Sequence, residues 1–380
     1  MKKICFVATI PGTVRTFTLP VIRQLLEKTD WEISVICNYD EKFAALLPPQ
    51  VRYIPVAMKR GVSLGGIGAV AKMARIFRKE KFDLIQYSTP NAAFYASIAA
   101  KMAGAERRKY HLMGFRFLGF TGWKRRLFKA IEKIACDLST DIECVSHSNM
   151  ELGVAEGIFK AEKARVLFYG SSAGVDLGKF DISKRDAWRK ELRREFGYEE
   201  DDCVFGFAGR ITGDKGINEL LAAFRGMEHP NARLFLAGHV EEEQTLDAQS
   251  MNWARENEKV RFCGFVPDLE RYYAMMDVLV LPSYREGFGN IIIEAQAMGL
   301  PVIVTDIPGP IDAMEADVTG LTVPVGDVAA LEQAMTTLCT SREIREEMGQ
   351  QGLAFVRERF DQEKLAQVIL EDRRALLSEK

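Results

Sequence analysis

The stretch PSYREGFGNIIIEAQAMGLPVIVTD, residues 282–306, places Glu286 and Glu294 close together around a turn flanked by glycines. Apolar and helix-forming residues follow the turn, which predicts that a helix starts there. Apolar runs typical of buried strands, DVLVLPS and LPVIVTD, stand on both sides of this helix. The stretch therefore predicts a strand, a tight turn, a helix and a second strand.

The same alternation of strands and helices runs along both halves of the chain. In the first half we expect strands at residues 3–9, 31–37, 51–56, 82–88, 108–113 and 141–146, and helices at residues 18–28, 67–80, 91–104 and 123–138. In the second half we expect strands at residues 203–210, 232–239, 259–266, 277–283, 300–306 and 320–325. Continuous apolar strands separated by helices indicate an α/β fold whose parallel sheets are covered on both faces.

One predicted helix, residues 123–138, has an apolar face at helical spacing. That face comprises Leu127, Ile131, Ile134, Ala135 and Leu138. A stripe of this kind is typical of a helix that packs on a sheet.

The regular pattern breaks at residues 168–183, a segment rich in glycine and serine that we interpret as a linker. A chain of 380 residues usually forms two domains. We therefore expect an N-terminal domain at 1–170, a linker at 171–184 and a C-terminal domain at 185–360. The final helix, in residues 361–380, is placed to leave the second domain and pack on the first.

Composition excludes several classes of protein. The net charge of −2 gives no global field for nucleic acid, and no apolar run is long enough for a membrane span. The short apolar run after the N-terminal lysines fits a buried first strand better than a signal peptide. The seven cysteines lack a CxxC pair, which indicates reduced thiols in a cytoplasmic protein, and the four histidines lack metal-ligand spacing.

Two cations follow the strand at 203–210. In an open parallel sheet, ligands bind at the carboxyl ends of the strands. Arg210 and Lys215 lie at one such strand–loop–helix junction, where a planar guanidinium and an ammonium could hold a diphosphate. The alternative interpretation is two solvated cations on a loop.

The quoted turn strengthens the case for a ligand. Gly287 and Gly289 allow close backbone approach, and Asn290 is a good N-cap for a helix whose amino terminus attracts anions. Glu286 could accept hydrogen bonds from sugar hydroxyls, and Glu294 could reach the hydroxyls of a ribose. The alternative is one loop glutamate and one glutamate that completes a helix cap.

These motifs resemble a known family. SYREGFGNIIIEAQAMGLPVIV is similar to the E-x7-E signature of the retaining GT-B glycosyltransferases of glycosyltransferase family 4 (group 1). GRITGDKG is similar to the family's Gly-Arg…Lys-Gly element, and the runs VRFCGFVPD…YYAMMDVLVLPS and GVDLGKF match as well. The resemblance covers roughly residues 166–360 and is weaker in the first half. It implies a GT-B fold, in which two doubly wound Rossmann-like domains face a central cleft. The domain at 1–170 would then bind the acceptor, and the domain at 185–360 would bind the nucleotide-sugar.

The resemblance also implies a role for each matching residue. Glu286 would contact the donor sugar and Glu294 the ribose, while Arg210 and Lys215 hold the diphosphate. The remaining contacts would come from the amides of Phe288, Gly289 and Asn290 to sugar and phosphate, and from Val266 to the base. Departure of a nucleoside diphosphate, most often UDP in such relatives, would then be stabilised by these charges without a metal or other cofactor. The chain also lacks a DxD motif in a loop position.

In the first half, the resemblance places Gly12 and Arg15 of TIPGTVRTF in a loop near the donor phosphates, although the family's usual double glycine is absent. Many relatives carry a histidine in the region of YHLMGFRFLGF. His111 lies there, and Arg116 is nearer the expected place. The alternative for His111 is a structural residue at a strand end.

The first half also carries a basic segment with interleaved aromatic residues. Its cations are Arg107, Arg108, Lys109, Arg116, Lys124, Arg125, Arg126, Lys129 and Lys133, opposed by Glu106 and Glu132, and its apolar residues are Phe115, Phe117, Leu118, Phe120 and Trp123. This composition suggests peripheral contact with an anionic membrane surface, and hence a lipid-linked glycan acceptor used at the inner face of the membrane. The alternative is a solvated helix face beside a buried aromatic loop.

Three other functions fit parts of the sequence. A GT-B sugar-nucleotide epimerase shares the architecture, but the E-x7-E pattern argues against it. A non-catalytic sugar-nucleotide-binding subunit would keep the same donor residues. A dinucleotide-dependent dehydrogenase would need a strand that ends in G-x-G-x-x-G, and none is present.

Overall fold

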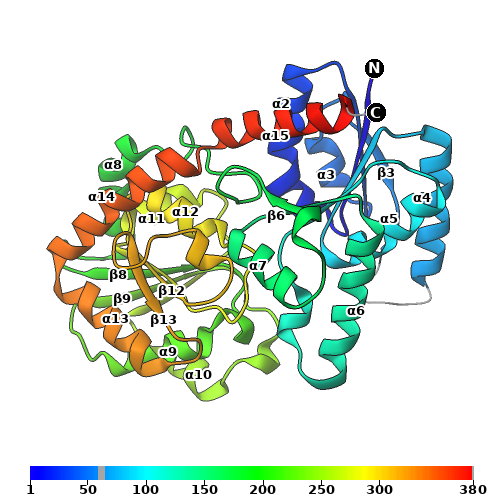
Figure 1. The fold of residues 1–380 in the computed structure, drawn as a ribbon. Helices are drawn as coiled ribbons and strands as arrows, with labels where there is room; N and C mark the ends of the chain where they lie inside the picture. Colours follow the sequence, from blue (N-terminus) through cyan, green and yellow to red (C-terminus); the bar gives the residue numbers. More distant parts are fainter. Residues whose placement is uncertain (59–64, 379–380) are drawn as a thin grey trace. The chain divides into compact units, whose positions relative to one another are not determined.

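The computed structural model describes residues 1–58 and 65–378, which fold as two α/β units (Figure 1). Unit 1 comprises Met1–Ala173 together with Glu363–Lys380, and unit 2 comprises Gly174–Gln362. Within the described residues, no helix combines the length and the apolar character needed to cross a membrane.

The strands of unit 1 form one parallel sheet in the order β3-β2-β1-β4-β5-β6-β7. They are β1 (Lys3–Val7), β2 (Glu32–Cys37), β3 (Arg52–Pro55), β4 (Leu84–Ser88), β5 (Arg108–Leu112), β6 (Asp141–Cys144) and β7 (Ala164–Val166). Every strand expected from the sequence of this half is present, and β7 is an addition. The chain reverses its direction of winding between β1 and β4, which pair side by side.

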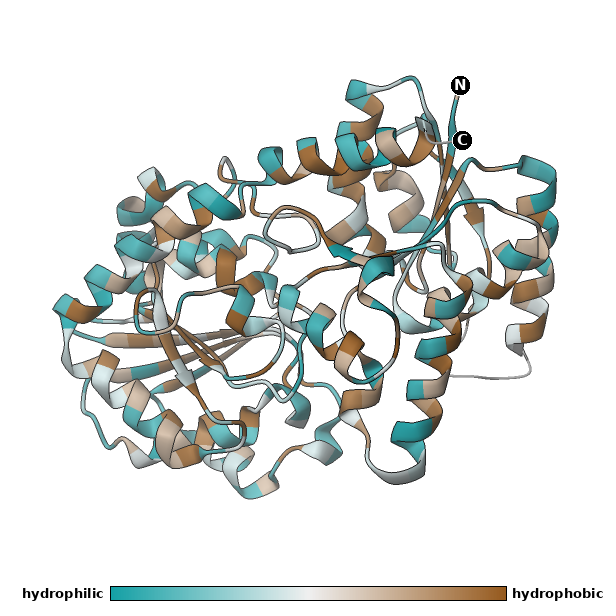
Figure 2. Cartoon of the chain, in the orientation of Figure 1, coloured by the Kyte–Doolittle hydropathy of each residue, from teal (hydrophilic) through white to brown (hydrophobic). Residues whose placement is uncertain are grey.

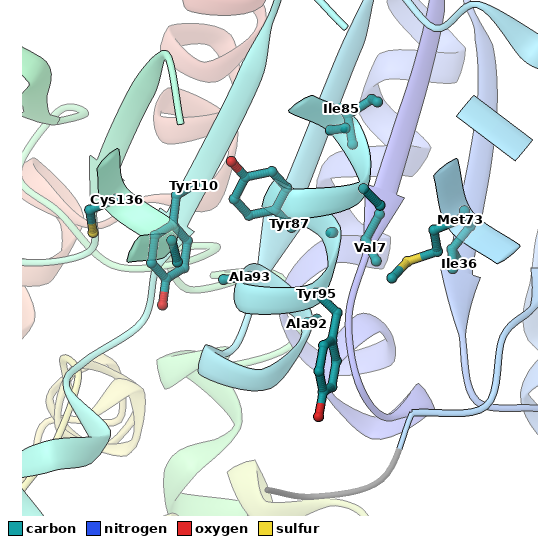
Figure 3. Close-up of a cluster of buried hydrophobic side chains, with 14 of the residues drawn as sticks. Val7, Ile36, Met73, Ile85, Tyr87, Ala92, Ala93, Tyr95, Tyr110 and Cys136 are labelled. Atoms are coloured by element: carbon teal, nitrogen blue, oxygen red, sulfur yellow. The ribbon is translucent and has the colours of Figure 1, made fainter. Parts of the chain in front are cut away.

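Helices cover both faces of this sheet. They are α1 (Pro11–Thr13), α2 (Leu19–Lys28), α3 (Glu41–Leu46), α4 (Gly65–Glu80), α5 (Pro90–Met102), α6 (Gly122–Leu138), α7 (His147–Ala155) and α15 (Gln362–Ser378). Successive strand residues point to opposite faces, so each strand supplies two cores. Val7, Tyr87 and Tyr110 enter the core on the face of α4 and α5 (Figure 3), whereas Phe6 and Leu84 enter the core that includes α15. Figure 2 shows the apolar strands between helices whose outer faces are hydrophilic.

The C-terminal helix α15 is fixed to the sheet by buried charges. The ammonium of Lys109 on β5 lies 3.0 Å from carboxylate oxygens of both Glu143 on β6 and Asp372 on α15. The guanidinium of Arg373, also on α15, lies 2.7 Å from Glu143 and donates to Gln86 on β4 at 2.8 Å. Because an unpaired buried ion is costly, this network holds α15 in one position on the sheet.

The strands of unit 2 form a second parallel sheet in the order β10-β9-β8-β11-β12-β13. They are β8 (Cys203–Ala208), β9 (Ala232–Ala237), β10 (Val260–Gly264), β11 (Val278–Leu281), β12 (Val302–Thr305) and β13 (Gly320–Val323). The helices are α8 (Arg185–Phe196), α9 (Ile217–Gly226), α10 (Ala248–Glu256), α11 (Leu269–Met275), α12 (Asn290–Ala297), α13 (Val328–Thr340) and α14 (Arg342–Arg359). As the sequence predicts, this half repeats the doubly wound pattern, and its switch in direction lies between β8 and β11.

The predicted apolar face of α6 is wrong in part. Leu127 and Ile134 are 45% and 42% exposed, although the spacing places them with the buried Ala135. The helix instead turns Glu132 toward the sheet, where its carboxylate accepts a hydrogen bond of 2.5 Å from the hydroxyl of Tyr110. A satisfied polar group on the inner face has displaced two apolar residues to the outer face.

The contribution of the buried ion pairs under α15 to stability can be tested by substitution. We expect Arg373→Met to destabilise unit 1 by about 3 kcal/mol, because it leaves Glu143 short of one buried partner. Amide hydrogen exchange in β4, β5, β6 and α15 should then accelerate by on the order of a hundredfold. The matched control is Arg374→Met, which removes a charge from the exposed neighbouring position. Equal exchange in the two variants would contradict a structural role for the network.

Candidate functional site

The candidate site of unit 2 lies at the carboxyl ends of β8 and β11, the two strands that flank its switch in direction. The loop after β8 and the loop after β11 are joined by a hydrogen bond of 3.0 Å from the amide of Tyr284 to the carbonyl of Asp214. Gly216 has φ of 71°, and a Cβ at this position would lie 2.0 Å from the carbonyl oxygen of Pro282. Only glycine allows the two loops to approach this closely.

This approach brings together two of the predicted site residues. The ammonium of Lys215 lies 2.5 Å from the carboxylate of Glu286, and the hydroxyl of Ser283 donates to the same oxygen at 2.9 Å. The side chains of Lys215 and Glu286 are only 17% and 14% exposed. An ammonium has three N–H donors, so the contact with Glu286 leaves donor capacity for an anionic ligand. Ser283 was not predicted from the sequence, although its place after β11 was a signal.

Arg210 is held more loosely than Lys215. Its guanidinium lies 3.7 Å from Asp214 and 3.6 Å from Glu241, and its side chain is 42% exposed. Asp214 has a closer partner in Arg285, at 2.7 Å. Burial alone would raise the pKa of Asp214, but a hydrogen bond from Thr212 and the neighbouring cations lower it overall. Asp214 is therefore a fixed negative charge that holds the loop cations around it.

The turn before α12 differs in one detail from the prediction. The N-cap is Gly289, in the left-handed region with φ of 88°, and Asn290 is the first helical residue rather than the cap. Glycine is favoured because this conformation is strained for residues with a Cβ. The ring of Phe288 is buried and packs on Phe360 with centroids 5.3 Å apart, which fixes the turn to the core of unit 2. The helix start remains a place where anions are favoured.

Glu294 contacts different elements from Glu286. Its carboxylate lies 3.4 Å from the hydroxyl of Tyr273 on α11, at the limit of a hydrogen bond. Burial raises the pKa of Glu294 to about 7, against the opposing effects of the Lys179 charge and the Tyr273 hydroxyl. Lys179 is itself paired with Glu270 at 3.3 Å. Glu294 thus changes charge near neutral pH.

The predicted base contact, Val266, follows β10 and is half-buried. The preceding residue, Phe265, is 61% exposed, and its ring stacks on that of His239 with centroids 6.3 Å apart. An exposed aromatic ring beside the carboxyl ends of β9 and β10 is a suitable surface for a planar base. Phe265 was missed in the sequence, where its position at a strand end was the available signal.

In unit 1, Gly12 and Arg15 do not lie in a loop as predicted. Gly12 belongs to α1, and Arg15 belongs to the π-helical turn Val14–Thr18 that continues into α2. The helix begins directly after the strand because Pro11 has the backbone angle of a first helical residue. Both residues are exposed near the carboxyl end of β1.

A threonine pair marks the switch in direction of the unit 1 sheet. The hydroxyls of Thr9 after β1 and Thr89 after β4 are 3.0 Å apart. Thr89 has φ of 72°, which is strained for a β-branched residue and is of a kind that clusters at functional sites. Neither threonine was predicted from the sequence.

His111 is buried on the sheet face that α15 covers. Its Nδ1 lies 3.3 Å from the hydroxyl of Ser88, and its Nε2 lies 3.8 Å from Glu143. Burial lowers the pKa of His111 to about 4, against the attraction of Glu143. A neutral, buried imidazole in the network beneath α15 fits the structural alternative for this residue. Arg116 instead donates to Asn91 at 3.0 Å and lies 4.5 Å from the ring centroid of Phe128.

Only part of the basic segment of unit 1 is paired with carboxylates. Arg125 and Lys129 share one carboxylate, that of Glu156 at the end of α7, at 2.8 and 2.6 Å. Lys109 is fully buried in the network under α15 and therefore belongs to no surface. Lys124 and Arg126 remain exposed on α6.

Comparison with known proteins gives a glycosyltransferase family model for each half of the chain. The sequence models described as glycosyl transferases group 1 and glycosyl transferase 4-like match residues 189–355 and 3–146. A capsular polysaccharide biosynthesis glycosyltransferase of Staphylococcus aureus, CapM, is 30% identical over 93% of this chain and 92% of its own. An Escherichia coli UDP-Gal:alpha-D-GlcNAc-diphosphoundecaprenol alpha-1,3-galactosyltransferase is 24% identical over 82% of this chain and 81% of its own.

Solved structures confirm the fold. Anabaena Alr3699/HepE, in complex with UDP-glucose, has a TM-score of 0.81 at 21% identity and covers 99% of this chain and 100% of its own. The glycosyltransferase WaaG, involved in lipopolysaccharide biosynthesis, has a TM-score of 0.74 at 16% identity, with 97% and 99% of the two chains covered. The predicted GT-B type of fold is therefore confirmed.

The contact between Gly216 and Pro282 can be tested by substitution. We expect Gly216→Ala to separate the two loops of the site, because the added Cβ would overlap the carbonyl oxygen of Pro282. The amide of Tyr284 should lose its bond to Asp214 and exchange its hydrogen faster. Gly197→Ala is the control, since Gly197 has a similar φ of 69° but no heavy atom within 4 Å of the added Cβ. Unchanged protection of Tyr284 in Gly216→Ala would refute the constraint.

The raised pKa of Glu294 predicts a dependence of stability on pH. The folded state holds a proton on this group up to about pH 7, whereas the unfolded chain releases it near 4.5. The resulting stabilisation is present below pH 4.5 and is lost as the pH rises through 7. Between these values we expect the free energy of unfolding of unit 2 to fall by roughly 1–3 kcal/mol relative to Glu294→Gln. Urea titration with Glu343→Gln as an exposed control measures this, and parallel profiles for all three proteins would contradict it.

Proposed function

Because this chain belongs to the group 1 glycosyltransferases, we propose that it moves a hexose from a UDP-sugar to a glycan acceptor in surface polysaccharide biosynthesis. The observation that carries this proposal is the contact of Lys215 with Glu286 at the switch point of the unit 2 sheet. The capsular polysaccharide relative and the UDP-glucose complex of a structural neighbour support the pathway and the donor.

The proposed donor site would place cations around the diphosphate, which is the part of the ligand that carries charge. Lys215 and Arg210 would hold the diphosphate, and the start of α12 would add the partial positive charge of its amides. Glu286 would accept hydrogen bonds from the sugar hydroxyls, since Ser283 and Lys215 fix its carboxylate. Phe265 and Val266 would lie against the base.

These groups would stabilise the leaving nucleoside diphosphate. As the bond between sugar and phosphate breaks, negative charge grows on the diphosphate, and fixed cations lower the energy of that state. Two cations and a helix amino terminus supply this charge, so we propose a metal-independent reaction. Net retention of the anomeric configuration is part of the proposal and is supported by the E-x7-E resemblance.

Nucleotide-sugar turnover tests the proposed function. Incubation with a panel of sugar nucleotides should give slow hydrolysis to UDP, and the activity should survive EDTA. Glu286→Gln should lower turnover by on the order of a hundredfold with little change in UDP affinity. Glu294→Ala should mainly weaken UDP binding, because its expected partner is the ribose.

Other outcomes of this experiment identify other functions. Interconversion of the sugars would show an epimerase, and binding without turnover in the presence of glycan acceptors would show a non-catalytic subunit. If Glu286→Gln and Glu294→Ala both bind UDP and turn over the sugar nucleotide like the unsubstituted protein, the proposed roles of the two glutamates are wrong. Loss of activity in EDTA, restored by Mg²⁺, would contradict metal independence.

We further propose that the acceptor is lipid-linked and that α6 meets the membrane. Trp123, Leu127 and Ile134 form an exposed apolar line on this helix, with exposed fractions of 69%, 45% and 42%. The exposed cations Lys124 and Arg126 lie beside it. An apolar line flanked by cations is the composition of helices that lie in an anionic membrane surface. The undecaprenol-linked substrate named for the Escherichia coli relative supports a lipid-linked acceptor.

Liposome binding tests the membrane contact. Trp123→Ser should reduce co-sedimentation with anionic vesicles severalfold, because the largest exposed apolar side chain is lost. The double charge reversal Lys124→Glu with Arg126→Glu should abolish the preference for anionic over neutral lipid at low salt. UDP-sugar hydrolysis should be unchanged in both variants. Lys101→Glu, an exposed cation on α5, is the control, and equal binding to neutral and anionic vesicles would refute the proposal.

A further inference from the structure

Unit 2 contains a pocket with a volume of about 590 Å³. It lies at the edge of the sheet opposite to the proposed donor site. Its lining residues Asp202, Asp277 and Pro301 stand immediately before β8, β11 and β12, at the amino ends of these strands. Lys215 and Glu286 follow the carboxyl ends of β8 and β11. The two sites are therefore separated by the length of the strands.

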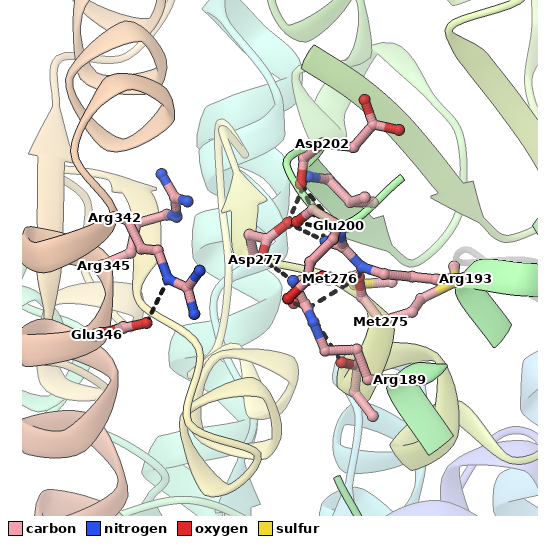
Figure 4. A network of polar contacts seen from close by, with 12 residues as sticks. Arg189, Arg193, Glu200, Asp202, Met275, Met276, Asp277, Arg342, Arg345 and Glu346 are labelled. Carbon is pink, nitrogen blue, oxygen red and sulfur yellow. Dashed lines mark hydrogen bonds and ion pairs between the residues drawn. The ribbon is translucent and has the colours of Figure 1, made fainter. Parts of the chain in front are cut away.

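Arginines from two helices line this pocket. They are Arg185 and Arg189 from α8, and Arg342 and Arg345 from α14. Figure 4 shows Arg342 and Arg345 on one side and Arg189 with Asp277 on the other. Arg189 lies 2.6 Å from Asp277, Arg342 lies 2.7 Å from Glu346, and Arg345 donates to the carbonyl oxygens at the end of α13.

Arg185 differs from the other three. Among the described residues, no hydrogen bond or ion pair to its guanidinium is present, and its Nε is buried without a partner. Its guanidinium packs against the turn at Gly299, where an added Cβ would lie 3.1 Å from Nη1. Burial lowers the pKa of Arg185, with a further contribution from the charge of Arg189. A half-buried cation without a direct partner is costly, and an anion in the pocket would remove that cost.

The lining holds six acidic residues against four arginines, so the pocket has no net positive charge. Three of the carboxylates have closer partners: Asp277 is shared between Arg189 and Arg193, Asp202 is paired with Arg233 at 2.9 Å, and Glu346 is paired with Arg342. The other acidic lining residues, Asp186, Glu200 and Asp201, are exposed. Among the described residues none of these carboxylates forms an ion pair with Arg185, so an anion would be held by direct contact with that guanidinium rather than by the net charge of the pocket.

We propose that this pocket binds a phosphate-bearing small molecule, with Arg185 as its principal anchor and Arg342 and Arg345 as further cations. A guanidinium presents a planar pair of donors that matches two phosphate oxygens. The volume exceeds that of a single phosphate and falls within the range of small-molecule sites. Because the anchors come from α8 and α14, the ligand would link these two helices. This site does not depend on the proposed transfer reaction.

The test measures binding of inorganic phosphate, pyrophosphate and glucose 6-phosphate by calorimetry at constant ionic strength. All measurements are made in a Lys215→Gln and Arg210→Gln background, so that the donor site contributes no phosphate contacts. We expect at least one probe to bind, and Arg185→Gln to weaken its binding by about tenfold or more. The control Lys190→Gln removes an exposed cation from the same helix and should leave binding unchanged.

Thermal unfolding supplies a second readout that separates binding from misfolding. Without phosphate, Arg185→Gln should be at least as stable as the parent, because a cation without a partner has been removed. With a saturating probe the order should reverse, since only the parent gains the ligand's stabilisation. Equal binding of all three probes would support the proposal and would show that the shared phosphate group alone is recognised. Equal binding by Arg185→Gln and Lys190→Gln, or no binding of any probe at millimolar concentration, would overturn the proposal.

Discussion

The close approach of Gly216 to Pro282 is the constraint on which the unit 2 site depends. A doubly wound sheet leaves a gap in its connections where the chain reverses direction, and ligands bind there because the loops on either side diverge. In this protein the two loops instead touch at one point, and the contact places a lysine of one loop on a glutamate of the other. Glycine with a positive φ makes that contact possible. The backbone geometry at Gly216 thus decides that Lys215 and Glu286 can meet.

The sequence predicted most of this arrangement. Continuous apolar strands indicated two parallel sheets, and parallel strands end at a common edge, so Lys215 and Glu286 could be assigned to one site without coordinates. The contact between them could not be predicted, because it depends on the distance between two loops. The predicted N-cap at Asn290 was one residue too late for a similar reason. The side chain of Asn290 suits an N-cap, but the turn needs a residue with left-handed backbone angles one position earlier, and that residue is Gly289.

Two predictions about α6 failed in part, and both depend on contacts with residues far along the chain. Helical spacing assigned Leu127 and Ile134 to the core, yet the hydroxyl of Tyr110 accommodates Glu132 there. The run of cations on α6 indicated a basic surface, yet two of them, Arg125 and Lys129, share the carboxylate of Glu156 at the end of α7. Local patterns report the character of a segment, whereas its orientation depends on partners far along the chain. Because Leu127 and Ile134 turn outward, α6 carries an exposed apolar line together with Trp123.

Charge is handled differently at the two edges of the unit 2 sheet. At the carboxyl edge, Lys215 is paired with Glu286, so the diphosphate that we propose as its ligand would share the ammonium with the carboxylate. The ammonium has three N–H donors, so such sharing would leave Glu286 in position. At the amino edge, Arg185 has no such direct partner and remains positively charged. The ammonium of Lys215 is therefore already compensated by a carboxylate of its own unit, whereas an anion that reached Arg185 would be the first direct partner of that guanidinium among the described residues.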